Sequence, residues 1–224
     1  MFALYMRVGD HILNDYKPLA TSEKVADVLE AMEELKCSHL PVLDEGKYLG
    51  LISEDDLLDI ENVEQKLEQH LNVLKPYQVQ ESTHIYEAIR VFGEGNLTCL
   101  PVLNEEQKYI GYLSPQELMW DLGQQVSFAE KGAVVVLRLS VRDYHISQIA
   151  QIVESEDALI LGLQLRSAGS DFLNVAVKIN QSDLSRIVKA FERYEYNVVE
   201  LYHESLFDDT ASDRYEGLVK YLNI

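Results

Sequence analysis

The sequence predicts a mixed α/β protein whose first half is built from an internal repeat. Residues 40–43 read Leu-Pro-Val-Leu and return as residues 100–103, and the apolar pattern of residues 48–53 returns in residues 109–114. The offset between the copies grows from 60 to 61, because the second turn has one extra residue. A repeat of this length indicates two units that bury their apolar faces against each other. Beyond residue 132 the order of predicted elements is different.

Each copy of the repeat is predicted to contain a strand, a helix, two strands and a second helix. Residues 21–22 and 82–83 are Thr-Ser and Ser-Thr, which we expect to be helix N-caps. From Val25 onward, apolar residues fall at i, i+3, i+4 and i+7, the spacing of an amphipathic helix. We expect Ser53 and Ser114 to cap the second helix of each copy, because acidic residues that favour a helix N-terminus follow both.

The second half has the element order βαββαβ, which is typical of split-βαβ, ferredoxin-like domains. The predicted strands and helices cover residues 133–137, 146–153, 158–165, 172–179, 184–191 and 198–202.

The predicted boundaries follow from these patterns. Residues 1–128 form the repeat domain, with copies at about 15–62 and 75–122, and residues 132–203 form the second domain. The polar segment 122–131 is interpreted as a linker. Residues 204–224 form an acidic tail, within which we expect a short docking helix.

Composition excludes several classes of function. The net charge of −19 argues against nucleic acid and anionic membranes as partners, because both require clustered Lys and Arg. We expect a cytoplasmic protein without a signal peptide or a membrane span. Cys37 and Cys99 are too few for a disulfide framework or a zinc site and are expected to be buried, reduced thiols.

The repeated motif resembles the cystathionine-β-synthase-type (CBS) domain over roughly residues 15–122. The resemblance rests on Leu-Pro-Val-Leu at residues 40–43 and on Gly-Leu-Ile-Ser, which begins nine residues after Pro41. An acidic residue, Asp56, follows three positions after that serine. The second half resembles an ACT-type regulatory domain in its element order. The combination is similar to the acetoin-utilization (AcuB-like) group of proteins.

The CBS resemblance implies a nucleotide site in the first copy. In that family the Asp of the motif binds the ribose hydroxyls of adenosine nucleotides, and the Ser or Thr faces phosphate. Ser53 and Asp56 match those positions, and His39 lies where family members often place a basic phosphate contact. The other copy is expected to close over the base with three candidates, Tyr77, Val79 and Thr98.

The second copy departs from the motif, so we expect at most one nucleotide site in each chain. Glu117 replaces the Asp and is explained by helix capping, and Cys99 replaces the basic contact. In the first copy, Ser53 and Asp56 also fit a simple helix cap. Residues 54–56 are all acidic and would repel a polyphosphate, which favours adenosine or AMP over ATP.

No motif of an enzyme active site is present, and the six histidines lack metal-ligand spacing. Residues 140–145, where an ACT-type domain binds small ligands, contain no glycine, so an oligomerisation platform is favoured there. We therefore expect a non-enzymatic regulatory or sensor protein that binds an AMP-like nucleotide and forms a homodimer. The alternative is a ligand-free interaction scaffold, or a regulatory subunit acting on an unidentified partner enzyme.

Overall fold

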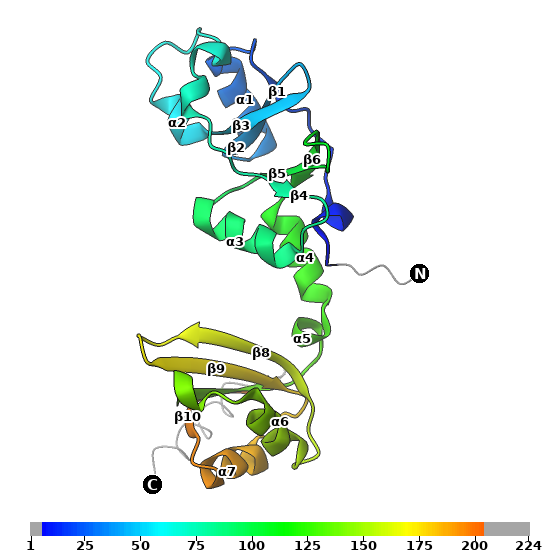
Figure 1. Cartoon of the computed structure of the whole chain (residues 1–224), viewed down its shortest axis with the longest axis vertical. Coiled ribbons are helices and arrows are strands. Elements are labelled where there is room, and N and C mark those ends of the chain that lie inside the picture. Colours follow the sequence, from blue (N-terminus) through cyan, green and yellow to red (C-terminus); the bar gives the residue numbers. More distant parts are fainter. Residues whose placement is uncertain (1–5, 204–224) are drawn as a thin grey trace, which may run out of the picture. The chain divides into compact units, whose positions relative to one another are not determined.

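The structure is a computed structural model that describes residues 6–203, and its contacts separate two compact units after Leu122. Figure 1 traces both units along the chain. The docking helix expected within residues 204–224 lies outside the described residues.

The first unit contains the predicted repeat, and each copy forms its own three-stranded sheet. The copies have the same register, since Leu19 pairs with Val42 in one and Val79 with Val102 in the other. The first copy comprises β1 (Leu19–Ala20), α1 (Val25–Leu35), β2 (His39–Asp44), β3 (Lys47–Ser53) and α2 (Glu54–Leu58). The second comprises β4 (Val79–Gln80), α3 (Ile85–Gly95), β5 (Leu100–Leu103), β6 (Tyr109–Leu113) and α4 (Pro115–Gln124). Two 3-10 turns, η2 (Leu67–Gln69) and η3 (Leu71–Val73), connect them.

The first helix of each copy begins later than predicted. Residues 21–22 and 82–83 lie in turns and bends, and the N-caps are Lys24 and His84. Both capping residues are held extended by isolated β-bridges, which delays the start of the helix. The Ser53 cap of α2 is as predicted, because its hydroxyl accepts from the Asp56 amide.

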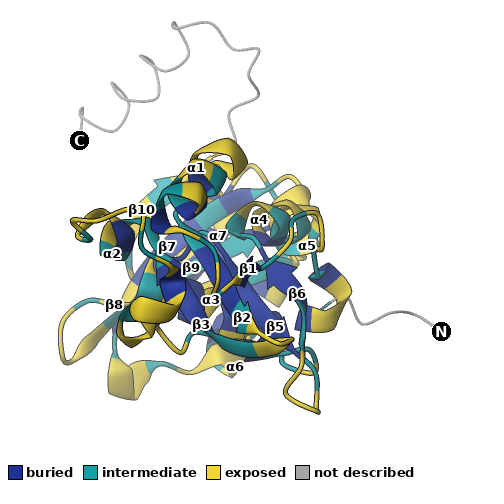
Figure 2. Ribbon diagram, turned by 90° about the horizontal axis from the view of Figure 1, so that it is seen from above, coloured by how far each residue is buried: buried dark blue, intermediate teal, exposed yellow. Residues whose placement is uncertain are grey.

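Each copy buries a compact apolar core beneath its helices. In α1 the predicted stripe is inaccessible, with Val25 and Val28 at 0% exposure and Met32 at 1%. They pack against Leu40 and Val42 of β2, and burial of such a side chain contributes about 1.5–3 kcal/mol. Figure 2 shows the buried residues concentrated on the strands and on the inner faces of the helices.

The segment that precedes each copy in the chain pairs with an edge strand of the other copy. The 3-10 turn η1 (Val8–His11) and Leu13 precede the first copy but join the second, where Leu13 and Tyr112 exchange two backbone hydrogen bonds. Lys75 precedes the second copy and exchanges two bonds of 2.9 Å with Leu51 of the first. This exchange was not predicted, because the first copy was expected to begin at about residue 15.

The second unit has ferredoxin-like topology, as predicted. Its antiparallel sheet has the order β10-β7-β9-β8, and α6 and α7 lie together on one face (Figure 1). The element bounds are β7 (Ala133–Ser140), η4 (Val141–Asp143), α6 (Ile146–Glu154), β8 (Ile160–Ser167), β9 (Phe172–Ile179), α7 (Ser185–Arg193) and β10 (Asn197–Tyr202).

The segment 122–131, predicted from its composition to be a linker, is largely helical. It holds the end of α4 and a short helix, α5 (Val126–Ala129), in which Phe128 N donates to Gln125 O. The helix contacts β8, and Lys178 Nζ on β9 donates to Phe128 O at 3.2 Å.

Candidate functional site

Ser53 and Asp56 form a closed hydrogen-bonded pair where β3 ends and α2 begins. Ser53 Oγ accepts from Asp56 N at 3.1 Å and donates to Asp56 Oδ2 at 2.6 Å. The capping role that the sequence left open is therefore present. It occupies one carboxylate oxygen of Asp56 and leaves Oδ1 to face other groups.

Lys75 brings a cation to this pair. Its Nζ lies 3.8 Å from Asp56 Oδ1, with the lysine side chain 53% exposed and that of Asp56 26% exposed. The position is fixed by the backbone pairing of Lys75 with Leu51, which lies two residues before Ser53 on β3. Lys75 was not predicted as a site residue, because it lies outside the motif, two residues before the candidate Tyr77.

His39 and Thr98 join the two copies beside Ser53. His39 pairs directly with Ser53 across the β2–β3 ladder. Its Nδ1 accepts from Thr98 N at 3.3 Å and lies 3.2 Å from Thr98 Oγ1. Burial lowers the pKa of His39 below its usual value, although Asp55 and Asp56 oppose the shift. At neutral pH the ring is uncharged, and because Nδ1 is an acceptor, its proton is on Nε2.

The other two candidates, Tyr77 and Val79, differ in how far their side chains are buried. The Tyr77 side chain is half-buried, and its carbonyl accepts from Tyr48 Oη at 2.6 Å. Val79 is only 5% exposed, and its side chain packs in the core of the second copy. Ser53, Asp56, His39 and Thr98 thus form one continuous group, which Lys75 extends, whereas the side chain of Val79 is not part of it.

The corresponding position in the second copy is apolar and aromatic. Ser114 Oγ accepts from Glu117 N at 3.1 Å, as the capping interpretation requires. Leu51 corresponds to Tyr112 in the repeat, so Leu13, which pairs with Tyr112, occupies the place of Lys75. Cys99 stands in place of His39, is 0% exposed, and has a pKa raised to about 12 by burial.

Tyr16 closes this second position further. Its hydroxyl donates to Cys99 Sγ at 2.9 Å, and its ring lies 4.0 Å from that of Tyr112. Burial and the neighbouring thiol raise the pKa of Tyr16. The side chains of the second copy therefore fill the space with packed rings and a neutral thiol.

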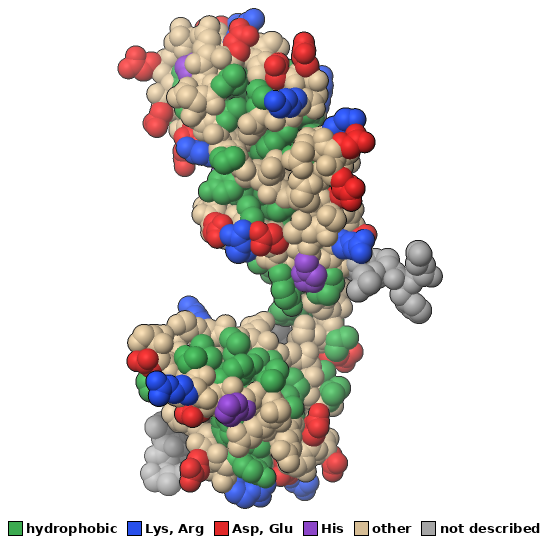
Figure 3. Space-filling view, viewed as in Figure 1, with side chains coloured by type: hydrophobic (Ala, Val, Ile, Leu, Met, Phe, Trp, Pro, Cys, Tyr) green, Lys and Arg blue, Asp and Glu red, His purple; other side chains and the backbone are tan. Residues whose placement is uncertain are grey.

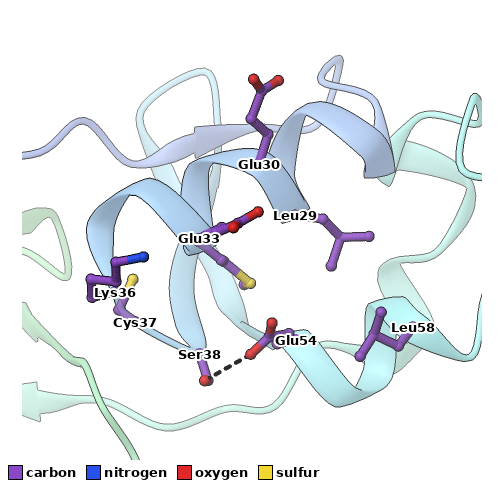
Figure 4. Close-up of a pocket in the computed structure, with 9 residues that line it drawn as sticks. Leu29, Glu30, Glu33, Lys36, Cys37, Ser38, Glu54 and Leu58 are labelled. Atoms are coloured by element: carbon purple, nitrogen blue, oxygen red, sulfur yellow. Dashed lines mark hydrogen bonds between the residues drawn. The ribbon is translucent and has the colours of Figure 1, made fainter.

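A pocket of about 510 Å³ lies between α1 and α2 of the first copy. Figure 4 shows Ser38 donating to Glu54 at its edge, with the Ser38 Oγ–Glu54 Oε2 distance 2.9 Å. Glu30 and Glu33 also line it, against one cation, Lys36. An acidic pocket of this kind disfavours phosphate, and its lining does not include Ser53, Asp56 or Lys75.

A second pocket, of about 420 Å³, lies in the second unit beside the connection from β7 to α6. Ser140 Oγ donates to Asp143 Oδ2 at 2.7 Å and accepts from the Asp143 amide, which closes the turn that the sequence marked as glycine-free. Asp143 and His145 line the pocket together with Gln148, which accepts from Tyr196 Oη at 3.0 Å.

Residues 6–203 contain neither a metal cluster nor a membrane-spanning helix. No group of three or more His, Cys, Asp or Glu in this range is arranged to hold a metal ion. No helix in the same range has the length and apolarity required to cross a membrane.

The sequence pattern that defines the CBS domain matches residues 8–62 and 73–122. Residues 8–122 form a tandem pair of CBS domains. The match begins at residue 8, so it includes the η1 segment that crosses to the second copy.

Relatives of known sequence or structure match about half of this chain. A curated relative, an uncharacterised protein of Methanocaldococcus jannaschii, is 23% identical over 115 residues, which is 51% of this chain and 43% of its own length. The chain thus matches less than half of that relative. A crystal structure of a CBS domain pair/ACT domain protein from Thermotoga maritima is 25% identical, with a TM-score of 0.47 over 52% of this chain and 96% of that one. A putative acetoin utilization protein (AcuB) from Vibrio cholerae is 21% identical, with a TM-score of 0.44 over 52% and 90%.

Proposed function

We propose that the CBS pair binds an AMP-like adenosine nucleotide in its first copy and that the protein is a non-enzymatic regulator or sensor. The observation that supports this proposal is the position of the Asp56 carboxylate, between the Ser53 hydroxyl and the Lys75 ammonium. A carboxylate can accept from the two vicinal hydroxyls of ribose, and a neighbouring ammonium can bind phosphate.

The charge of the group favours one phosphate over three. Lys75 is the cation that faces Asp56, and residues 54–56 are all acidic. Each additional phosphate would add negative charge close to those carboxylates, whose repulsion one ammonium offsets only in part. In the proposed complex His39 donates a neutral Nε2–H, Thr98 orients His39, and Tyr77 contacts the base.

The second copy is proposed to remain without nucleotide. It has Leu13 in place of Lys75 and the buried thiol of Cys99 in place of the His39 ring. Glu117 could still accept from a ribose, but no corresponding cation would accompany it.

A matched pair of variants tests the proposed site. Asp56→Ala removes the charged acceptor for the ribose, an interaction of about 1.5–3 kcal/mol, so AMP affinity should fall roughly tenfold to 150-fold. Glu117→Ala removes the corresponding carboxylate of the second copy and should leave AMP affinity unchanged. Titration calorimetry of both variants with AMP measures the difference. Loss of binding in Glu117→Ala with retention in Asp56→Ala would place the site in the wrong copy.

The alternative function is a ligand-free scaffold or a regulatory subunit of a partner enzyme. The closed Ser53–Asp56 cap favours this alternative, because it satisfies the carboxylate without a ligand. Thermal unfolding in the presence of adenosine, AMP, ADP, ATP or S-adenosylmethionine separates the two functions. A ligand that binds only the folded state raises its stability, and the absence of a shift with all five compounds would leave the scaffold.

A cytoplasmic homodimer completes the proposal. Exposed apolar side chains lie on the helices of the CBS pair, with Leu58 65% and Met119 68% exposed, and hydrophobic patches are visible on its surface in Figure 3. Packing of these helices against a second copy would bury them. We assign the second unit as an ACT-type oligomerisation domain, which its βαββαβ order supports. A sedimentation mass equal to one chain at physiological salt would contradict the dimer.

A further inference from the structure

The sheet of the second unit has one face that α6 and α7 do not cover, called here the open face. Along β7, Val135 and Leu137 belong to the core shared with the helices, so the alternating Val134, Val136 and Arg138 point to the opposite face. The ladder extends this face across the sheet, because residues that pair directly share a side. Its members are Val134, Val136, Arg138 and Ser140 of β7, Phe172, Asn174, Ala176 and Lys178 of β9, Gly162, Gln164 and Arg166 of β8, and Asn197, Glu200 and Tyr202 of β10.

The open face is basic in a chain whose net charge is −19. It carries three cations, Arg138, Arg166 and Lys178, and one carboxylate, Glu200. Arg138 and Arg166 both pair with Asn174, so the three residues form one row across three strands.

One end of that row, Arg138, also lines the pocket of about 420 Å³ that contains Asp143 and Glu195. Arg138 and Arg166 are exposed, and no carboxylate within residues 6–203 forms an ion pair with either. The Arg138 guanidinium lies 5.3 Å from the centre of the Phe172 ring. Asn174 Oδ1 is buried without a hydrogen-bond partner in the described part of the chain. At the other end of the face, Lys178 is engaged by the carbonyl of Phe128 on α5.

The chain itself supplies an acidic segment at the edge of this face. β10 ends at Tyr202, which pairs with Val134 on the adjacent strand. The 21 residues that follow His203 contain five acidic and two basic residues, with Asp208 and Asp209 adjacent, and several large apolar side chains.

The chain that follows His203 is long enough to reach Arg138 and Arg166. Arg138 lies four residues along β7 from Val134 and one strand from β10, which is about 14 Å from Tyr202 at the usual rise and spacing. Arg166 lies two strands further, at about 19 Å. An extended chain of five or six residues after His203 spans about 17–20 Å, so Asp208 and Asp209 can reach both guanidinium groups.

We propose that residues 204–224 dock on the open face of the same chain, with Asp208 and Asp209 against Arg138 and Arg166. Apolar residues of the segment cover Val134 and Ala176, which are half-buried. A second copy of the open face is the wrong occupant, because it would bring three cations against the same three cations with only Glu200 to offset them on each side.

Trypsin cleavage after Arg214 in the full chain tests the docking. Mass spectrometry follows the rate at which the intact chain loses residues 215–224. Arg138→Gln with Arg166→Gln should speed this cleavage roughly two- to tenfold, since each exposed ion pair contributes little alone. Arg186→Gln with Lys189→Gln removes two exposed cations from α7, on the helix side of the sheet, and should leave the rate unchanged.

A change in the segment itself provides the second arm, because loss of the Arg138–Phe172 contact can disturb the fold. Asp208→Asn with Asp209→Asn leaves the described residues intact and should speed cleavage by the same factor. A variant that carries all four substitutions should be cleaved no faster than either double variant, because both double variants remove the same contact. Wild-type rates in all variants would overturn the proposal. A cleavage rate that changes on dilution of the protein would assign the segment to a second copy and would also overturn it.

Discussion

Lys75→Met separates recognition of phosphate from recognition of ribose. In the ligand-free protein, Lys75 forms an ion pair of 3.8 Å in which the lysine is 53% exposed. Such exposed pairs contribute about 0.2–1 kcal/mol, so the free energy of unfolding should change by less than about 1 kcal/mol. With AMP bound, the same ammonium makes a charge-assisted contact worth about 1.5–3 kcal/mol, and its loss should weaken AMP roughly tenfold to 150-fold.

Adenosine provides the internal reference for this variant. It has no phosphate, so its affinity for Lys75→Met should change by less than about fivefold, the limit set by the lost pair with Asp56. Lys66→Met is the matched control, because Lys66 is 52% exposed and lies 3.9 Å from Glu68. Titration calorimetry with both ligands measures all three proteins. An equal loss for AMP and adenosine would show that Lys75 acts through the ribose, and the assignment of phosphate to Lys75 would be refuted.

Three further results are expected. In Gly111→Ala the added Cβ would lie 2.6 Å from Leu13 O, and the residue would have to keep a φ of +143°. Urea unfolding should therefore show a free energy of unfolding lower by about 1–4 kcal/mol. Gly93→Ala, where the added Cβ meets open space, should not lower it. Since the folded state lowers the pKa of His39 from 6.5, the unfolded state binds the proton better, and stability should fall as pH drops below about 6.5; His39→Gln should flatten that part of the stability curve. Native thiol titration should label half-buried Cys37 before Cys99, whose pKa is about 12 and whose side chain is inaccessible; simultaneous labelling would contradict this order.

The sequence predicted those features that depend on local pattern. The apolar stripe from Val25 and the strands around residues 40–53 follow from periodicity, and the Ser53 cap follows from a serine placed before three acids. The order βαββαβ was likewise readable, because each element of the second unit has its own apolar period.

Contacts between segments that are distant in the chain could not be predicted from the sequence. The cation beside Asp56 comes from Lys75, which reaches it only because the segment before the second copy pairs with Leu51 of the first. Val79 resembled a ligand contact by position, but its apolar side chain is buried with the second core. Neither the cross-copy pairing nor the depth of a strand residue leaves a local signal in the chain.

The exchange of leading segments gives the repeat the architecture of a domain-swapped dimer fused into one chain. Leu13 bridges the edge strand of the later copy, and Lys75 bridges the edge strand of the earlier one. A solitary copy would keep its own three strands, but its edge strand would lack this bridge unless a second molecule supplied it. The two copies therefore support each other's edges, and a newly synthesised first copy leaves the edge of β3 unpaired at Leu51 until Lys75 has been made.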